Sequence, residues 1–557
     1  MKYPVYISLF LLLAAACSQP ATYDIIIKNG TVIDGSGNEG FRADIGISAD
    51  TIAFIGDLSG ETADEIIDAS GLVVAPGFIN MLSQAHESLM MDPLAQSDIR
   101  QGVTLEVLGE GWSMGPWNDG IKKGERAYQK DFKYKIDWTT LGEYMQYMED
   151  KGISVNIASF VGAATLRVHE LGRETRAPNP DELKRMQDLA RTAMEEGAVG
   201  VSSALIYTPG LYAQTDELIA LSKAVAEYDG MYITHLRSEG DNILKSVDEF
   251  LEICNTAGID GQIHHLKLAG GHNWNKYDTV IMKLDSARAA GLNVSTNMYT
   301  YTAAATGLDA AMPSWVQKGG IKEWVNRLQD PEMRKQVAEE MKHKSLEWEN
   351  FYFAAGSPDN ILLIGFRNDS LKYLTGKSLA EVAQMRGTTP EETAMDLVVQ
   401  DFSRVKVVYF LMSEENVQKQ IALPYMSFCS DAECISTDQQ FESYHPHPRA
   451  FGNFARLLGK YVREEKIIPL EDAIFKLTLL PATNLKLKKR GAIRVGYFAD
   501  IAIFDPEKIE DHATFDQPKQ YATGMFHVIV NGIPVLLNGE HTGNEPGIFV
   551  RGPGWKE

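Results

Sequence analysis

Short apolar runs separated by Asn, Gly and Asp occupy both ends of the chain. They are Tyr23–Gly30, Ala43–Ile47 and Thr51–Gly56 near the start, and Ala499–Phe504 and His527–Gly532 near the end. Runs of this length and composition are typical of strands in hairpins. We therefore expect residues 23–75 and 486–557 to form one small β domain together.

Between the two ends, apolar strands alternate with helical stretches, which favours a parallel sheet or barrel. The candidate strands are Phe78–Met81, Leu105–Leu108, Val155–Phe160, Val199–Ala204, Tyr232–His235, Gln262–Leu266, Asn293–Met298, Val407–Leu411 and Met426–Cys429. These are nine candidates for the eight places of a (β/α)₈ barrel. The span from about residue 301 to 405, with three tryptophans and charged helical stretches, is interpreted as an insertion that covers the barrel mouth.

The first 17 residues have the pattern of a lipoprotein signal peptide. A lysine precedes the apolar run Tyr6–Leu13, which is too short to span a membrane, and small residues lead to Cys17. The segment Leu13–Cys17 resembles a bacterial lipobox, in which the cysteine is lipidated. We expect an exported protein, facing the periplasm or outer membrane, that contacts the membrane only through a lipid anchor at Cys17; an ordinary signal cleaved nearby is the alternative.

Charge and cysteine content exclude two classes of protein. The formal net charge is -22, and no basic cluster interrupts the acidic balance, so a nucleic-acid partner is not expected. Three cysteines follow Cys17 (Cys254, Cys429 and Cys434), and three in so long an exported chain do not make a disulfide framework.

Titratable residues stand at the carboxyl ends of the candidate strands, where a barrel places its catalytic groups. His235 ends one strand, His264 and His265 lie on the next with Lys267 two residues beyond, and Asp431 follows the last. Imidazole and carboxylate groups suit zinc, and a catalytic zinc keeps one position open for water. If the strand continues past His265, Lys267 lies on the same face as this histidine.

Several segments together resemble the amidohydrolase superfamily, specifically its N-acyl-D-amino-acid deacylase (D-aminoacylase) family. The similar segments are Ala75–Ile79, Thr234–Gly240, His265–Lys267, Tyr299–Ala303, Ser430–Asp431, His447–Arg449 and Arg490–Asp500, in the family's order from about Tyr23 to Asn538. The resemblance implies a metal-dependent (β/α)₈ barrel at 76–485 and a β-sandwich built from both chain ends.

The resemblance also implies roles for particular residues. His235 and His265 match metal ligands, and Asp431 matches the catalytic acid and base. The substrate carboxylate is held in the family by groups that match Lys267 and Arg449, together with tyrosines that would match Tyr207 and one of Tyr299 or Tyr301. The substrate class is then a small N-acylated amino acid.

Two departures from the family pattern change the expected metal site. Leu82 and Gln84 stand where most amidohydrolases have a His-x-His pair, so the outer metal position is expected to be unoccupied. Where D-aminoacylases have a metal-binding cysteine turn, this chain has Glu110 between two glycines. We interpret Glu110 as the third ligand beside His235 and His265, in a site for one zinc per chain. A capping carboxylate at Glu110, or a ligand role for His86, are the alternatives.

The resulting functional hypothesis is zinc-dependent hydrolysis of the amide bond of N-acyl-D-amino acids or related N-acylated amino acids. A dipeptidase or cyclic-amide hydrolase of the same superfamily is one alternative. A non-catalytic binding lipoprotein that lost its first metal pair is the other.

Overall fold

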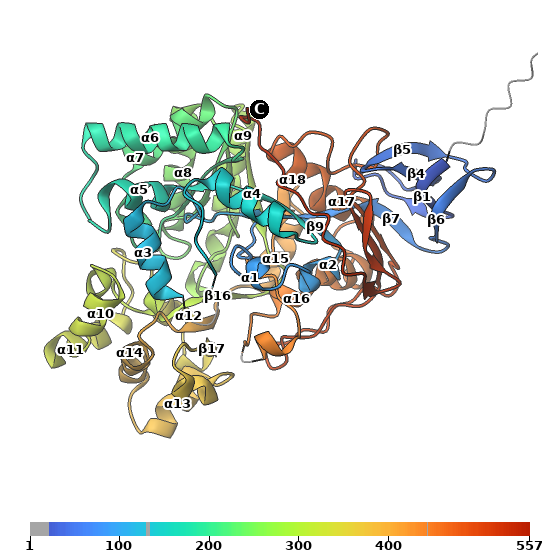
Figure 1. Cartoon of the computed structure of the whole chain (residues 1–557). Coiled ribbons are helices and arrows are strands. Elements are labelled where there is room, and N and C mark those ends of the chain that lie inside the picture. Colours follow the sequence, from blue (N-terminus) through green and yellow to red (C-terminus); the bar gives the residue numbers. More distant parts are fainter. Residues whose placement is uncertain (1–21, 130–133, 443, 557) are drawn as a thin grey trace, which may run out of the picture.

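The computed structural model describes residues 22–129, 134–442 and 444–556 (Figure 1). The predicted signal peptide and Cys17 lie outside the described residues. Within the described ranges, no helix combines the length and the apolar character needed to cross a membrane.

Two sheets form the β domain at the right of Figure 1. The first has the order β5-β4-β1-β6, from β1 (Thr22–Lys28), β4 (Asp44–Ser48), β5 (Thr51–Gly56) and β6 (Thr62–Asp68). The second has the order β23-β22-β21-β20-β7-β2-β3, from β2 (Thr31–Val32), β3 (Phe41–Arg42), β7 (Val73–Pro76), β20 (Ile501–Phe504), β21 (Met525–Val530), β22 (Ile533–Leu537) and β23 (Glu540–His541).

The two chain ends meet in the second sheet. Strand β20 pairs antiparallel with β7, with Ile501 opposite Pro76, and both sheets contribute isoleucines to one apolar core. Ile27 and Ile47 from the first sheet and Ile503 from the second are each at most 1% exposed. Burying one such side chain contributes roughly 1.5–3 kcal/mol, so this core holds the ends of the chain together.

Eight successive positions in the rest of the chain are filled by parallel strands. They are β8 (Phe78–Asn80), β9 (Val103–Leu108), β10 (Asn156–Ser159) with its continuation β11 (Val161–Gly162), β12 (Gly200–Ala204), β13 (Met231–His235), β14 (Asp260–Ile263), β15 (Val294–Met298) and β19 (Met426–Phe428). The nitrogen of Met81 donates to the Phe428 oxygen at 3.2 Å, so the first and last strands also lie side by side.

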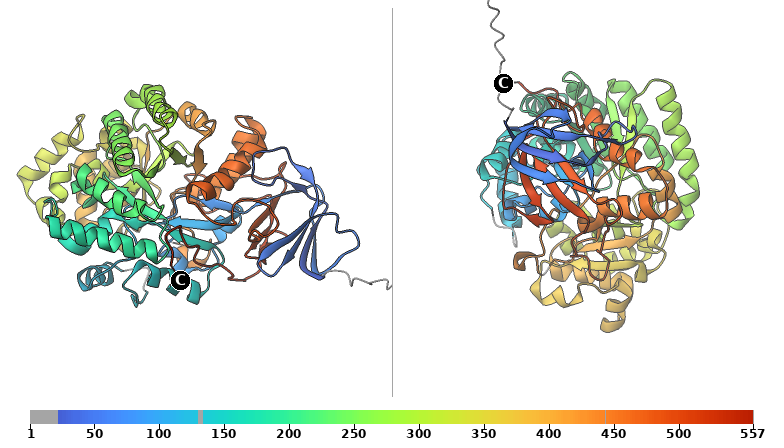
Figure 2. Two further views of the ribbon diagram at one scale, coloured as in Figure 1. Left: turned by 90° about the horizontal axis from the view of Figure 1, so that it is seen from above. Right: turned by 90° about the vertical axis from the view of Figure 1, so that its right-hand side faces the viewer.

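Helices connect these strands and cover them on the outside (Figure 2). They include α4 (Leu141–Lys151), α6 (Pro180–Glu195), α7 (Thr215–Ala226), α8 (Ile243–Ala257) and α9 (Tyr277–Ala289). Helix α6 shows how the sequence fixes a boundary: Asn179 caps the first turn, Glu182 completes a capping box, and Pro180 occupies the first helical position. Strand β9 is buried at all six residues, as expected where helices cover a parallel sheet.

The insertion has a sheet of its own. Strand β18 (Lys406–Phe410) pairs antiparallel with β16 (Ala303–Gly307) and β17 (Ile361–Gly365), and joins none of the parallel strands. The ninth candidate strand therefore belongs to the insertion, and the boundary expected near residue 405 lies too early. Helices of the insertion gather at the lower left of Figure 1; they include α10 (Ile321–Arg327), α11 (Pro331–Met341), α13 (Leu379–Arg386) and α14 (Pro390–Asp401).

The last residues return to the parallel strands. Backbone nitrogens of Gly547 and Val550 donate to the oxygens of Ile153 and Ile157, each at 2.8 Å, and Lys556 N donates to Glu195 O at 3.0 Å. The C-terminus consequently lies beside α6 rather than in the β domain, to which the sequence had assigned residues 486–557 as a whole.

Candidate active site

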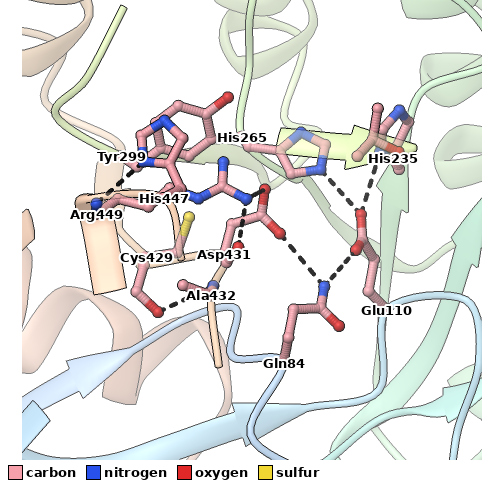
Figure 3. A network of polar contacts seen from close by, with 12 residues as sticks. Gln84, Glu110, His235, His265, Tyr299, Cys429, Asp431, Ala432, His447 and Arg449 are labelled. Atoms are coloured by element: carbon pink, nitrogen blue, oxygen red, sulfur yellow. Dashed lines mark hydrogen bonds and ion pairs between the residues drawn. The ribbon is translucent and has the colours of Figure 1, made fainter. Parts of the chain in front are cut away.

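The predicted chemistry-bearing residues come together at one end of the parallel strands (Figure 3). His235 is the last residue of β13, His265 lies two residues after β14, Glu110 two residues after β9, and Asp431 three residues after β19. The carboxyl ends of parallel strands meet at the same edge, which explains why residues up to 321 positions apart in the chain become neighbours.

Two glycines allow the turn that presents Glu110. Gly109 and Gly111 have φ values of 96° and 66°, in the left-handed region that favours glycine. A Cβ atom on Gly109 would lie 2.4 Å from the Phe160 oxygen, and one on Gly111 would lie 2.7 Å from the Ala204 nitrogen. Any larger residue on either side of Glu110 would therefore displace its carboxylate.

The Glu110 carboxylate contacts both predicted histidine ligands. Its Oε1 atom lies 2.9 Å from His265 Nε2 and 3.1 Å from His235 Nδ1. Burial by itself would raise the pKa of Glu110, but the hydrogen bonds with His235 and His265 lower it well below its ordinary value. The carboxylate is thus held in its anionic form, as a metal ligand must be.

A second carboxylate, Glu239, lies behind the two histidines. Glu239 Oε1 is 3.1 Å from His265 Nδ1, and Oε2 is 3.4 Å from His235 Nε2, so each imidazole has its other nitrogen beside this group. Metal-bound histidines commonly place their second nitrogen against a carboxylate, which fixes the orientation of the ring. The sequence analysis missed this role for Glu239; the available signal was its position four residues after His235, in a segment already recognised as similar to the family.

Lys267 lies in the site, but the backbone that carries it is not the extended strand that was predicted. Strand β14 ends at Ile263 and His265 has a φ of 32°, so the strand does not continue as expected. The ammonium nevertheless lies 2.7 Å from His265 Nδ1 and 2.6 Å from Glu239 Oε1. Burial opposes ionisation of Glu239, but the charges of His235 and Lys267 lower its pKa, so the lysine neutralises this carboxylate.

Asp431 pairs with Arg449 on the other side of the site. Arg449 Nη2 lies 2.8 Å from Asp431 Oδ2 and also donates to the Asp431 backbone oxygen. Burial raises the pKa of Asp431, and the charges of Arg449 and His265 oppose this effect without cancelling it. A carboxyl group whose pKa is raised toward neutrality is suited to exchange protons.

Arg449 keeps two donors free of protein partners in the part of the chain that the structure describes. Its Nε and Nη1 atoms are buried without a hydrogen bond, although the side chain is only 3% exposed. His447 stabilises the turn that precedes Arg449. Its Nδ1 atom accepts a hydrogen bond from Arg449 N, and its Nε2 atom donates one to the Ala303 oxygen, both at 3.0 Å. These contacts give His447 a structural role in holding the turn that presents Arg449.

The predicted tyrosines divide into two groups. Tyr299 packs against Arg449, with the guanidinium carbon 4.3 Å from the centre of the tyrosine ring. The ring centre of Tyr207 lies 5.2 Å from that of His235. The Tyr301 hydroxyl instead donates to Asp511 Oδ2 at 3.2 Å. Of the two alternatives left open by the sequence, the structure places Tyr299 beside Arg449 and turns the Tyr301 hydroxyl away.

Comparison with known proteins agrees with this geometry. The model of the Amidohydrolase family matches residues 367–536. The D-aminoacylase of Alcaligenes xylosoxydans xylosoxydans is 32% identical over 537 residues, which cover 95% of this chain and 97% of that protein. The chain belongs to the D-aminoacylase family of amidohydrolases. It is therefore a hydrolase that acts on amide bonds, and the resemblance seen in the sequence is confirmed.

Two further relatives support the assignment to the D-aminoacylase family. The N-acyl-D-glutamate deacylase of the same organism is 32% identical over 532 residues, covering 95% of this chain and 96% of that protein. The crystal structure of the N-acyl-D-glutamate deacylase from Bordetella bronchiseptica, complexed with zinc and a phosphonate inhibitor, has a TM-score of 0.79 at 29% identity and covers 95% of this chain and 100% of that one.

The donor set of this D-aminoacylase family member fits a metal ion. One ligand atom each from Glu110, His235 and His265 lies within 4.8 Å of the others. Ligand atoms around a tetrahedral zinc are about 3.3 Å apart, close to the 2.9 and 3.1 Å between Glu110 Oε1 and the two imidazole nitrogens. His86 is absent from this group, and Leu82 is 1% exposed and apolar.

A second buried cluster lies near the site. Asp98, Glu106 and Cys434 approach one another, and Asn80 donates to Glu106 Oε2 at 2.8 Å and to Ser430 Oγ at 2.8 Å. Burial raises the pKa of Asp98 to about 6, and burial together with the charge of Asp98 raises that of Glu106 well above its ordinary value. The folded protein therefore favours a protonated pair.

The raised pKa values of Asp98 and Glu106 lead us to expect that Asp98→Asn changes the free energy of unfolding in a pH-dependent way. Because the pKa of Asp98 is raised on folding, its stabilising contribution is complete below its unfolded pKa of about 4 and is lost as pH rises through about 6. We expect Asp98→Asn to raise the free energy of unfolding relative to the parent by roughly 1–3 kcal/mol at pH 8 and by less at pH 5. Denaturant unfolding at both pH values measures this, with the exposed Asp150→Asn as control; an equal change at both pH values would contradict it.

Proposed function

We propose that this protein hydrolyses N-acyl-D-amino acids or closely related N-acylated amino acids, with one zinc ion held by Glu110, His235 and His265. The observation that carries the proposal is the convergence of three metal-ligand atoms with Asp431 and Arg449 at one strand edge. A relative with the same overall fold was crystallised with zinc and a phosphonate that mimics the tetrahedral intermediate.

The chain's own residues supply the proton transfers. Bound zinc would polarise the amide carbonyl and favour the ionisation of water. As the water oxygen bonds to the carbonyl carbon, Asp431 accepts the proton that the water loses. Asp431 then donates this proton to the amide nitrogen as the C–N bond breaks. A carboxylic acid and a free amino acid leave. Glu239 holds both imidazoles in orientation throughout, because it contacts one nitrogen of each.

Arg449 provides the binding group for the substrate carboxylate. The positive charges of Lys267 and Arg449 do not by themselves require an anionic substrate, because Lys267 is paired with Glu239 and Arg449 with Asp431. The stronger argument is that Arg449 Nε and Nη1 are buried without partners, which costs free energy until an acceptor arrives. A substrate carboxylate can accept a charge-assisted hydrogen bond from one of these free donors.

Arg449→Met is therefore expected to raise KM strongly for substrates that carry the carboxylate. Loss of a charged hydrogen-bonded contact costs about 1.5–3 kcal/mol, or on the order of 10- to 100-fold. Steady-state kinetics on an N-acetyl amino acid and on the matched neutral amide measures the difference. Equal impairment of both substrates would make Arg449 a structural residue only.

Screening of substrate classes tests the proposed activity. The soluble domain is assayed with N-acyl-D-amino acids, the L-enantiomers, dipeptides and cyclic amides, and the D-series is expected to be hydrolysed fastest. Turnover of cyclic amides or dipeptides alone would favour those rival hydrolases. Zinc binding without any amide turnover would favour a binding lipoprotein.

We also infer that the eight parallel strand positions form a (β/α)₈ barrel and that the two sheets of the β domain form a β-sandwich. The hydrogen bond between Met81 and Phe428 supports closure of the barrel, and the shared isoleucine core supports the sandwich. The carboxyl ends of barrel strands are where catalytic groups of this architecture lie.

Attachment through a lipid at Cys17 is a further part of the proposal, supported by the signal-like sequence of residues 1–17. The parent protein is expected to fractionate with membranes, and Cys17→Ala to release it into the soluble fraction, because the lipid is the proposed anchor. Immunoblotting of both fractions measures this. A variant that stays wholly with the membranes would show that another element tethers the protein.

A further inference from the structure

Gln84 lies between the two catalytic carboxylates, at a position where the family pattern leads one to expect a histidine (Figure 3). Its Nε2 atom donates to Glu110 Oε2 at 2.7 Å and to Asp431 Oδ1 at 3.3 Å. A side-chain amide carries two N–H donors, so one nitrogen can serve both acceptors at the same time.

Backbone hydrogen bonds hold the segment that carries Gln84 beside the segment that carries Asp431. Gln84 N donates to the Ala432 oxygen at 3.0 Å, and Asp431 N donates to the Leu82 oxygen at 2.9 Å. The segments 82–84 and 431–432 are thereby joined in a defined register. The Gln84 side chain therefore starts from a backbone position within reach of Asp431.

The contacts divide the oxygens of both carboxylates between different partners. Glu110 directs Oε1 to the two histidines and Oε2 to Gln84. Asp431 directs Oδ1 to Gln84 and Oδ2 to Arg449. Two neighbouring carboxylates repel each other unless a donor or a cation lies between them, and here the neutral amide of Gln84 takes that place.

We propose that Gln84 is a positioning residue that stands where other family members would bind a second metal ion. Its amide orients Glu110 so that one carboxylate oxygen faces the histidines, and it holds Asp431 at a set distance from Glu110. The inference rests on the proposed function. It predicts that the chemical step depends on the amide of Gln84 and that a negative charge there would recruit a second cation.

Gln84→Met removes the donors and keeps the length of the side chain. Loss of a hydrogen bond that orients a metal ligand typically costs about 10- to 100-fold in activity. We expect kcat to fall by that factor, KM to stay unchanged, and zinc to remain at one per chain when zinc is in excess. Leu221→Met, a buried substitution in helix α7 that removes no polar contact, is the control and is expected to keep the parent kcat.

Gln84→Glu gives a readout that does not depend on activity. It would place a third carboxylate against Glu110 and Asp431 without a donor between them, so we expect a second zinc ion per chain in excess zinc, measured by elemental analysis after gel filtration. One zinc in this variant, or a parent-like kcat in Gln84→Met, would overturn the role of Gln84. A parent protein that binds no zinc or hydrolyses no amide would instead refute the proposed function.

Discussion

Asp431→Asn is expected to lower kcat by about 10²- to 10⁴-fold, the usual contribution of a positioned general acid and base. The substituted amide keeps the shape of the side chain but cannot accept the proton from water or return it to the amide nitrogen. Zinc content is expected to remain at the parent value because the three ligands are unchanged, and KM is expected to change far less than kcat because the Arg449 side chain is retained. Steady-state kinetics with elemental analysis measures all three quantities.

The result of this experiment distinguishes a proton-transfer role of Asp431 from a purely structural one. A parallel loss in the carboxylate substrate and in the neutral amide is expected, since both need the same proton transfer. A variant with parent kcat would show that Asp431 serves only to pair with Arg449, from which it accepts at 2.8 Å.

Glu110→Gln is expected to remove bound zinc. The substitution replaces the anionic ligand with a neutral amide and leaves two histidines, too few to retain the ion through dialysis. Lewis-acid assistance is worth several kcal/mol, so activity should fall by on the order of 10³-fold. Zinc per chain before and after dialysis is the measurement, with Glu195→Gln, a partly exposed glutamate that pairs with Lys556, as control.

A retained zinc ion in Glu110→Gln would contradict the ligand assignment and return Glu110 to the role of a supporting carboxylate. Partial recovery of activity at high zinc concentration would agree with the assignment, because weakened affinity can be overcome by mass action.

Much of the fold could be predicted because local pattern and tertiary structure agree. The strand-like runs at both chain ends alternate with turn residues, and the structure joins them through β7 and β20. The strand at 406–410 was harder to place, since its apolar composition resembles that of the parallel strands. Its antiparallel pairing with β16 and β17 is a tertiary feature that periodicity cannot reveal.

The residues of the site were predictable to the extent that they end strands or match a family motif. Glu110, His235 and His265 converge as expected. Glu239 was missed because its contacts with two histidines and Lys267 depend on how the loop after β13 folds back. Gln84 was noticed only as a missing ligand, and its contacts with two carboxylates appear only once residues 82–84 lie beside 431–432.

Reconstitution of the metal-free protein with zinc tests the central claim most directly. Hydrolysis of an N-acyl-D-amino acid is followed while zinc is added in steps to protein stripped by a chelator. Glu110, His235 and His265 make one site, so activity is expected to rise in proportion to added zinc and to level off at one equivalent per chain. Full activity without zinc, or activity that begins only with the second equivalent, would contradict it.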